Sequence, residues 1–200
     1  LENDLTNEKL HYPHSHTGAA LLDQDDLKQA ISKYQDDGWQ IAVHAQGDVA
    51  IREVLDAFES VHDEGADHRH RLEHCLLLEN ESIKRMHALN IHPSFHINHL
   101  YYYGEALSES IIGDERTETI LPIKNAEHEG LTYSIHADQP MFESDPLALI
   151  HTAVNRKTRD GKSIGSYNKV SVESALKAVT INAAWQIKME DKIGSIKVGK

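Results

Sequence analysis

Four short candidate strands constrain the fold most, because each one contains or ends near a polar residue and precedes an amphipathic stretch. These segments are WQIAVH (39–44), RHRLEHC (69–75), IHPSFHI (91–97) and LTYSIH (131–136). The helices expected around them cover 25–37, from Gly47 or Asp48 to 65, 80–89, 117–129, 145–156 and 171–186. Strands that alternate with helices in this way predict an α/β fold with parallel strands and crossover helices. Right-handed crossovers build either an open doubly wound sheet or part of a barrel.

Neither architecture is complete in the pattern. The glycine fingerprints of a nucleotide-binding open sheet are absent, and DGKSIGS (160–166) has neither their spacing nor a preceding strand. Four strand–helix units are half of the eight in a closed (β/α) barrel, which typically needs ~250 residues.

Composition excludes several classes of partner. The formal net charge of −12 argues against nucleic acid, and no apolar run reaches the ~20 residues of a membrane span. A lone cysteine, Cys75, cannot form an internal disulfide, which fits a reducing compartment, and a cytoplasmic location is expected. Nucleic acid and membranes are therefore not expected partners.

Residues able to bind metal or move protons stand at the end of each predicted strand. They are His44, His74, His96 or His99, and His136 with Asp138. In parallel α/β folds the carboxyl ends of the strands face the site, so the repeated placement favours a shared site. A single histidine at a strand end is more often structural, and Asp48 is expected to cap the following helix.

Five stretches together resemble the amidohydrolase superfamily, and within it the family that includes N-substituted formamide deformylases. They are HAQGDVAIREVLDAFE (44–59), RLEHCLLLENESIKRMHALNIHPSF (71–95), NHLYYYGE (98–105), SIHADQPMFESDPLALI (134–150) and VSVESALKAVTINAAWQIKMEDKIGSIKVGK (170–200). The resemblance implies a metal-dependent hydrolase with a (β/α) TIM-type barrel, of which residues 1–190 are the second half, about strands five to eight. Residues 191–200 then begin a strand that returns to a β-sandwich.

The resemblance also implies roles for individual residues. The expected ligands of a divalent metal are His44, His74 and Asp138. Zinc is the metal most strongly indicated, because two neutral imidazoles and a carboxylate suit that ion. Asp138 is the expected general base and then general acid in metal-assisted hydrolysis of a C–N amide-type bond. His99 or His96 is expected to hydrogen-bond the substrate or its oxyanion, with Tyr102 and His136 also in the substrate site.

The departures from the family pattern define the alternative. The family's HxH pair after strand one and its strand-four lysine or acid would precede Leu1, and HSH (14–16) has the spacing in the wrong place. We therefore expect the C-terminal part of a longer enzyme, with weak metal affinity and doubtful turnover by itself. The alternative is a non-catalytic half-barrel. Its open sheet edges would be covered by association with an identical chain or a partner.

Overall fold

The computed structural model describes residues 18–61 and 66–198, and within them four strands form one parallel sheet in the order β1-β2-β3-β4. The strands are β1 (Ala42–Ala45), β2 (Arg71–His74), β3 (His92–His96) and β4 (Ser134–His136). Sequential neighbours pair in register, with His44 opposite Glu73 and His96 opposite His136. This is the predicted parallel α/β arrangement of a partial barrel. The HSH stretch at 14–16 lies outside the described residues.

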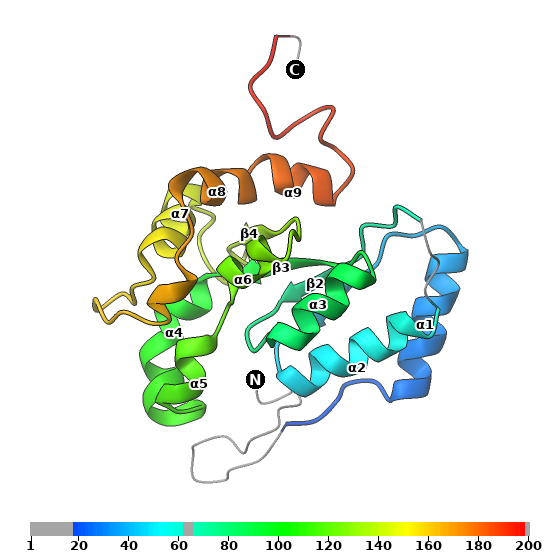
Figure 1. Cartoon of the computed structure of the whole chain (residues 1–200), viewed down its shortest axis with the longest axis horizontal. Coiled ribbons are helices and arrows are strands. Elements are labelled where there is room, and N and C mark those ends of the chain that lie inside the picture. Colours follow the sequence, from blue (N-terminus) through cyan, green and yellow to red (C-terminus); the bar gives the residue numbers. More distant parts are fainter. Residues whose placement is uncertain (1–17, 62–65, 199–200) are drawn as a thin grey trace.

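Helices connect and cover the strands (Figure 1). The α-helices are α1 (Gln24–Asp36), α2 (Asp48–Glu59), α3 (Asn80–Ala88), α4 (Asn98–Ala106), α5 (Asp114–Thr119), α6 (Ile123–His128), α7 (Pro146–Asn155), α8 (Val172–Ala178) and α9 (Ile181–Gln186), with a π-helical turn η1 (Leu107–Ile111) and a 3₁₀ turn η2 (Ser166–Asn168). Figure 1 shows α1, α2 and α3 grouped on one side of the view and α4, α5 and α7 on the other.

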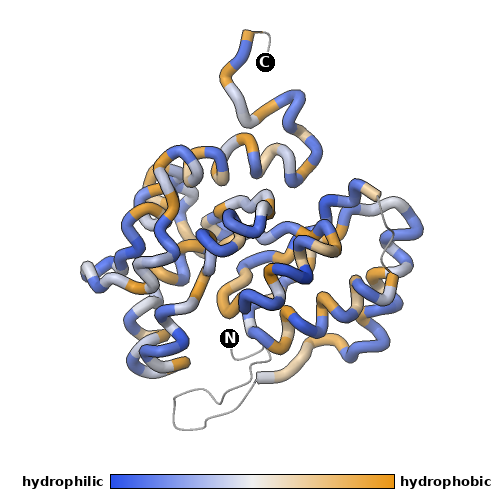
Figure 2. Tube along the Cα trace, in the orientation of Figure 1, coloured by the Kyte–Doolittle hydropathy of each residue, from blue (hydrophilic) through white to orange (hydrophobic). Residues whose placement is uncertain are grey.

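The amphipathic pattern of α2 shows how a helix packs against the core through one apolar face. Ile51, Leu55 and Phe58 recur at helical spacing and are all buried. Figure 2 shows the resulting alternation of apolar and polar residues along the helices. The helix begins after Gly47, which is its N-cap, so the expectation that Asp48 caps it through its carboxylate is wrong. The buried Asp48 carboxylate instead lies 3.5 Å from Arg52 Nη1 and 3.3 Å from Arg116 Nη2.

The amino ends of the strands are joined to α9 through Gln186. Its side-chain Nε2 donates to Pro93 O at 3.0 Å and to Thr132 O at 3.1 Å. Its Oε1 accepts from Ser134 Oγ, and its backbone carbonyl accepts from Gln40 Nε2 at 2.6 Å. Buried strand-end carbonyls that would otherwise lose water are thus satisfied by one glutamine.

The single helix predicted over 117–129 is wrong, since α5 and α6 are separated there. Leu121 has φ 48° and its N–H donates to Leu76 O at 2.9 Å. The buried guanidinium of Arg156 donates to Ile120 O and Leu121 O at 2.8 and 3.0 Å. Pro122, which follows, has no N–H to donate. Tertiary hydrogen bonds to the two carbonyls therefore replace helical ones.

Two further elements differ from the prediction. The helix predicted over 171–186 is interrupted at Val179–Thr180, where Thr180 has ψ −95° and three consecutive β-branched residues meet. The sequence pattern does not predict helix α4 (Asn98–Ala106), because it places His96 or His99 at the end of a strand.

The sheet has two strands with only one neighbour each among the described residues, β1 and β4. No helix in the described part of the chain is long and apolar enough to cross a membrane. Residues 191–198 form turns and bends, with Ile196 and Val198 fully exposed, so the expected returning strand stays a prediction.

Candidate metal centre

His74 and Asp138 both stand at strand ends with left-handed backbone. Their φ angles are 73° and 58°. Such angles are rare in residues other than glycine, cost on the order of 1–3 kcal/mol each, and gather at functional sites. At His74 the positive φ ends the regular alternation of β2, in which Leu72 points into the core. The His74 ring lies with histidines from the neighbouring strands, 4.6 Å from the His44 ring and 5.6 Å from the His96 ring.

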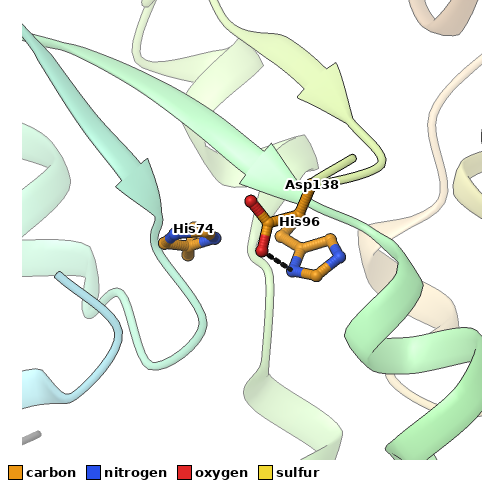
Figure 3. Close-up of side chains that lie close together, drawn as sticks. All are labelled: His74, His96 and Asp138. Carbon is orange, nitrogen blue, oxygen red and sulfur yellow. Dashed lines mark ion pairs between the residues drawn. The ribbon is translucent and has the colours of Figure 1, made fainter. Parts of the chain in front are cut away.

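His96, the last residue of β3, completes a group of three metal-type donors. One ligand atom from each of His74, His96 and Asp138 lies within 4.8 Å of the others. Figure 3 shows the Asp138 carboxylate directed at His96, whose Nδ1 is 4.0 Å from Asp138 Oδ2. That distance is too long for a hydrogen bond and close to the ~3.3 Å between two ligands of one tetrahedral zinc ion.

Three further histidines surround this group. The His44 ring centroid is 4.6 Å from that of His74, but His44 is exposed on β1 and is not a member of the three-residue group. The His136 ring is 5.1 Å from the rings of both His74 and His96. The His99 ring, on the first turn of α4, is 4.2 Å from His96.

Burial keeps the imidazoles of His74, His96, His99 and His136 neutral. It lowers the pKa of His74 to about 4, and the neighbouring His136 and His44 add to the effect while Asp138 opposes it. Burial lowers the pKa of His96 to about 3 and that of His99 to about 2, again with neighbouring histidines adding to it. The pKa of His136 is also lowered by burial. Neutral imidazole is the form that binds metal ions.

The donor set fits a divalent cation because it leaves buried nitrogen atoms without hydrogen bonds. Among the described residues no partner lies within bonding distance of His74 Nδ1, of either ring nitrogen of His96, or of His136 Nε2. Each such atom costs about 1–3 kcal/mol if nothing replaces the lost water. Imidazole nitrogen and carboxylate oxygen are also the ligand types that zinc prefers.

The predicted substrate residue Tyr102 lies at the rim of this centre. It is 42% exposed, and its ring stacks on Phe142 at 4.8 Å between centroids. Phe142 itself was missed from the sequence, although it follows Asp138 by only four residues in HADQPMF. Its ring lies 5.3 Å from His96. The signal in the sequence that could have identified Phe142 is its position, as an aromatic residue in the segment that follows a candidate ligand.

Comparison with known proteins identifies the family of this chain. The sequence profile of the Amidohydrolase family (Amidohydro_3) matches residues 5–200. The chain belongs to the amidohydrolase family. Curated amidohydrolase relatives include N-substituted formamide deformylase from Arthrobacter pascens, 28% identical over 187 residues, and putative amidohydrolase YtcJ from Bacillus subtilis (strain 168), 31% identical over 192 residues. The alignments cover 93% and 92% of this chain but 34% and 35% of those proteins, so the chain spans about a third of their length.

Solved structures show the same fold. An uncharacterized metal-dependent hydrolase from Pyrococcus furiosus superposes with a TM-score of 0.82 at 24% identity, over 97% of this amidohydrolase chain and 38% of that protein. One from Pyrococcus horikoshii OT3 superposes with a TM-score of 0.83 at 22% identity, over 97% and 39%. The four-stranded sheet therefore corresponds to part of a larger hydrolase fold.

Proposed function

We propose that this amidohydrolase chain carries part of the active site of a metal-dependent hydrolase that cleaves a C–N amide-type bond of a small molecule. The observation that carries the proposal is the group of His74, His96 and Asp138, whose ligand atoms lie within 4.8 Å of one another at the carboxyl ends of three strands. Family membership and the fold of the metal-dependent hydrolases support it. The name of the Arthrobacter relative supports an amide as the substrate class.

His74 and Asp138 would hold the cation, and both the sequence pattern and the geometry favour them. His96 is the third donor in the geometry, whereas the sequence resemblance favours His44. A divalent cation such as zinc, when bound, polarises the substrate carbonyl and lowers the pKa of water. Three ligands leave room for substrate, as catalytic zinc sites require.

We assign the proton transfers of the reaction to Asp138. Its side chain is 39% exposed, so one carboxylate oxygen can reach water while the other faces His96. We assign it the proton that leaves the attacking water, and then the delivery of that proton to the amine nitrogen as the C–N bond breaks. The products are a carboxylic acid and an amine.

His99 acts as a neutral hydrogen-bond donor in this scheme. With a pKa near 2 it carries no charge at neutral pH, so it offers one ring N–H. Placed beside His96, that N–H can stabilise the oxyanion that forms on the former carbonyl oxygen. The His136 ring lies 5.1 Å from that of His74, and His136 is assigned to substrate contact.

Amine release by the zinc-loaded chain tests the proposal. N-substituted formamides are supplied, and the amine is quantified with fluorescamine, for wild type and Asp138→Asn. We expect Asp138→Asn to lower the rate by at least about 10²-fold, since the base is lost while the shape is kept. Asp160→Asn is the matched control, because Asp160 is an exposed turn residue. A rate unchanged in Asp138→Asn, or no amine from the zinc-loaded wild type, would contradict the assignment.

A second candidate function is a non-catalytic chain that pairs with a second copy through the edge of the sheet at β1, which pairs only with β2 among the described residues. A groove of about 500 Å³ there is lined by apolar residues of α1 and β1, and Trp39 and Leu22 are 64% and 53% exposed. Light scattering separates the two candidates. A dimer that Trp39→Ser converts to a monomer, without zinc binding, favours pairing, whereas a zinc-binding monomer contradicts it.

A further inference from the structure

The backbone at the candidate ligand His74 has a conformation that its own sequence does not favour. His74 and the next residue, Cys75, have φ angles of 73° and 51°. Two consecutive residues other than glycine remain in the left-handed region only where the surrounding contacts fix them there. The place of the His74 ring in the metal centre therefore depends on the contacts of the segment that follows β2.

Hydrogen bonds from two sides fix this segment. On the side of β1, the Leu77 N–H donates to Gln46 O at 2.9 Å. On the other side, the Leu121 N–H donates to Leu76 O at 2.9 Å. Leu121, which lies between α5 and α6, thus fixes a peptide carbonyl only two residues after His74.

Leu121 is in turn fixed by Arg156. Its φ angle of 48° is also left-handed, so its conformation needs support from elsewhere. The Arg156 guanidinium donates from Nη1 to Leu121 O at 3.0 Å and from Nη2 to Ile120 O at 2.8 Å. Its Nε donates to Ile164 O at 2.9 Å. Because the donors of a guanidinium form a rigid planar fork, Arg156 fixes two consecutive carbonyls relative to each other.

The chain leaves room for this guanidinium at Gly165. A Cβ atom at that position would lie 2.9 Å from Arg156 Nη2 and 2.5 Å from Glu118 O, and the φ angle of Gly165 is 55°. Glycine is the residue that combines a positive φ with so close an approach. Arg156 is also 0% exposed, so bulk water has no access to its side chain. Packing and hydrogen bonds together therefore define where the guanidinium lies.

We propose that Arg156 is a positioning residue that sets the place of the candidate ligand His74. It acts through the backbone of Leu121 and Leu76, by the two hydrogen bonds Arg156 Nη1 to Leu121 O and Leu121 N to Leu76 O. The inference rests on the proposed function, because it concerns a ligand of the same centre. Arg156 is not one of the three residues whose donor atoms form that centre, so it affects where the His74 nitrogen lies and not the proton transfers.

Zinc affinity of the folded variants tests the proposal, measured by competition with a chromogenic chelator. Arg156→Met removes all three hydrogen bonds, whereas Arg156→Lys keeps a donor without the planar fork. Loss of a group that orients a metal ligand directly typically lowers metal affinity by about 10–100-fold. Arg156 acts through two peptide groups, so we expect the low end of that range for Arg156→Met, about tenfold, and about threefold for Arg156→Lys.

Gln186→Leu is the matched control for a general loss of stability. It also removes buried hydrogen bonds to backbone carbonyls, but at the amino ends of the strands, away from His74. We expect urea unfolding to show that it is destabilised, as the Arg156 variants are, while it binds zinc as wild type does. The visible absorption of the cobalt(II)-loaded chains is a second readout, because it depends on ligand geometry. The absorption should change in the Arg156 variants and stay as in wild type in Gln186→Leu.

Three results would overturn the inference. They are zinc affinity in the Arg156 variants equal to that of wild type, an equal loss of affinity in Gln186→Leu, and no zinc binding by wild type. If Arg156→Met does not fold, the comparison of Arg156→Lys with wild type decides. Amine release is measured on the same samples. Zinc binding that depends on Arg156 without amine release contradicts only the proposed function, and amine release with zinc binding independent of Arg156 contradicts only this inference.

Discussion

Asp138 Oδ2 and His96 Nδ1 lie 4.0 Å apart, although His96 ends β3, Asp138 follows β4, and the two are 42 positions apart in the chain. His96 is almost fully buried, whereas the Asp138 side chain is 39% exposed. With the pKa of His96 lowered to about 3, mainly by burial, the contact joins a neutral ring to a carboxylate at neutral pH. The pair is therefore neither hydrogen-bonded nor an ion pair at that pH, which leaves both atoms available as ligands of one cation.

Removal of His96 should therefore weaken metal binding. We expect His96→Asn to lower the zinc affinity of the chain by at least about tenfold, and by more than His44→Asn does, because His44 lies outside the three-residue group. Competition titration with a chromogenic zinc chelator measures this. His87→Asn, at an exposed histidine of α3, is the control. A larger loss with His44→Asn would favour the ligand set expected from the sequence.

Two buried histidines at the end of the sheet opposite the metal centre predict how the free energy of unfolding depends on pH. His70 and His92 are buried there, and burial lowers the pKa of each to about 4. The folded chain keeps both neutral while the unfolded chain binds protons below pH ~6.5, so the free energy of unfolding should fall as the pH drops from ~6.5 to ~4. Each histidine contributes about 3 kcal/mol at most over that range.

Urea unfolding at pH 7 and pH 4.5 measures this dependence. His70→Asn places an acceptor where His70 Nδ1 accepts from the Ile41 N–H at 3.0 Å, but it cannot titrate. We expect the difference in unfolding free energy between the two pH values to shrink in this variant. His87→Asn should leave the difference as in wild type. An unchanged difference in His70→Asn would mean that His70 is not the group that titrates.

The sequence predicted those parts of the fold that depend on local periodicity. The four strands and the helices α1, α3 and α7 lie within a few residues of their predicted ranges, because each has apolar residues that the core buries. Helix α2 begins where predicted but ends at Glu59, before the predicted end at 65, and residues 62–65 lie outside the described part of the chain. The parallel α/β arrangement is confirmed by the pairing of all four strands in chain order. The local hydrophobic pattern was therefore sufficient to predict the elements whose apolar residues are buried in the core.

Interactions between distant residues explain what the sequence did not predict. The break between α5 and α6 depends on Arg156, which lies 35 residues beyond Leu121. At the centre, the sequence left open whether His96 or His99 faces the substrate. The structure separates them, because α4 begins at Asn98 and places His99 on a helix, whereas His96 ends a strand beside Asp138. A positive φ, such as that at His74, has no local signal in a histidine.

Gln186 should contribute strongly to stability because it joins α9 to three strand-end groups. Gln186→Leu removes the donors to Pro93 O and Thr132 O and the acceptor for Ser134 Oγ, all in a buried setting. We expect the free energy of unfolding to fall by about 2–4 kcal/mol, measured by urea unfolding. Gln29→Leu on exposed α1 should change it by no more than about 0.5 kcal/mol. A similar small change in Gln186→Leu would show that water replaces these hydrogen bonds.

Arg156 sets two opposed effects against each other. Its side chain is fully buried, and burial lowers its pKa to about 10, so the folded state disfavours the charged form of the guanidinium. Its guanidinium nevertheless donates to three backbone carbonyls, those of Ile120, Leu121 and Ile164. Arg156→Met removes the buried charge but leaves three carbonyls without donors, at about 1–3 kcal/mol each.

We expect the loss of hydrogen bonds to exceed the relief of charge burial, with Arg156→Met less stable by about 3–5 kcal/mol. Arg156→Lys keeps the charge but cannot reproduce the planar fork, so it should also be destabilised, by a smaller amount. Arg159→Met, at an arginine whose side chain is 64% exposed, is the control. Thermal unfolding followed by circular dichroism ranks the three variants. A methionine variant as stable as wild type would mean that the buried charge costs as much as its three hydrogen bonds contribute.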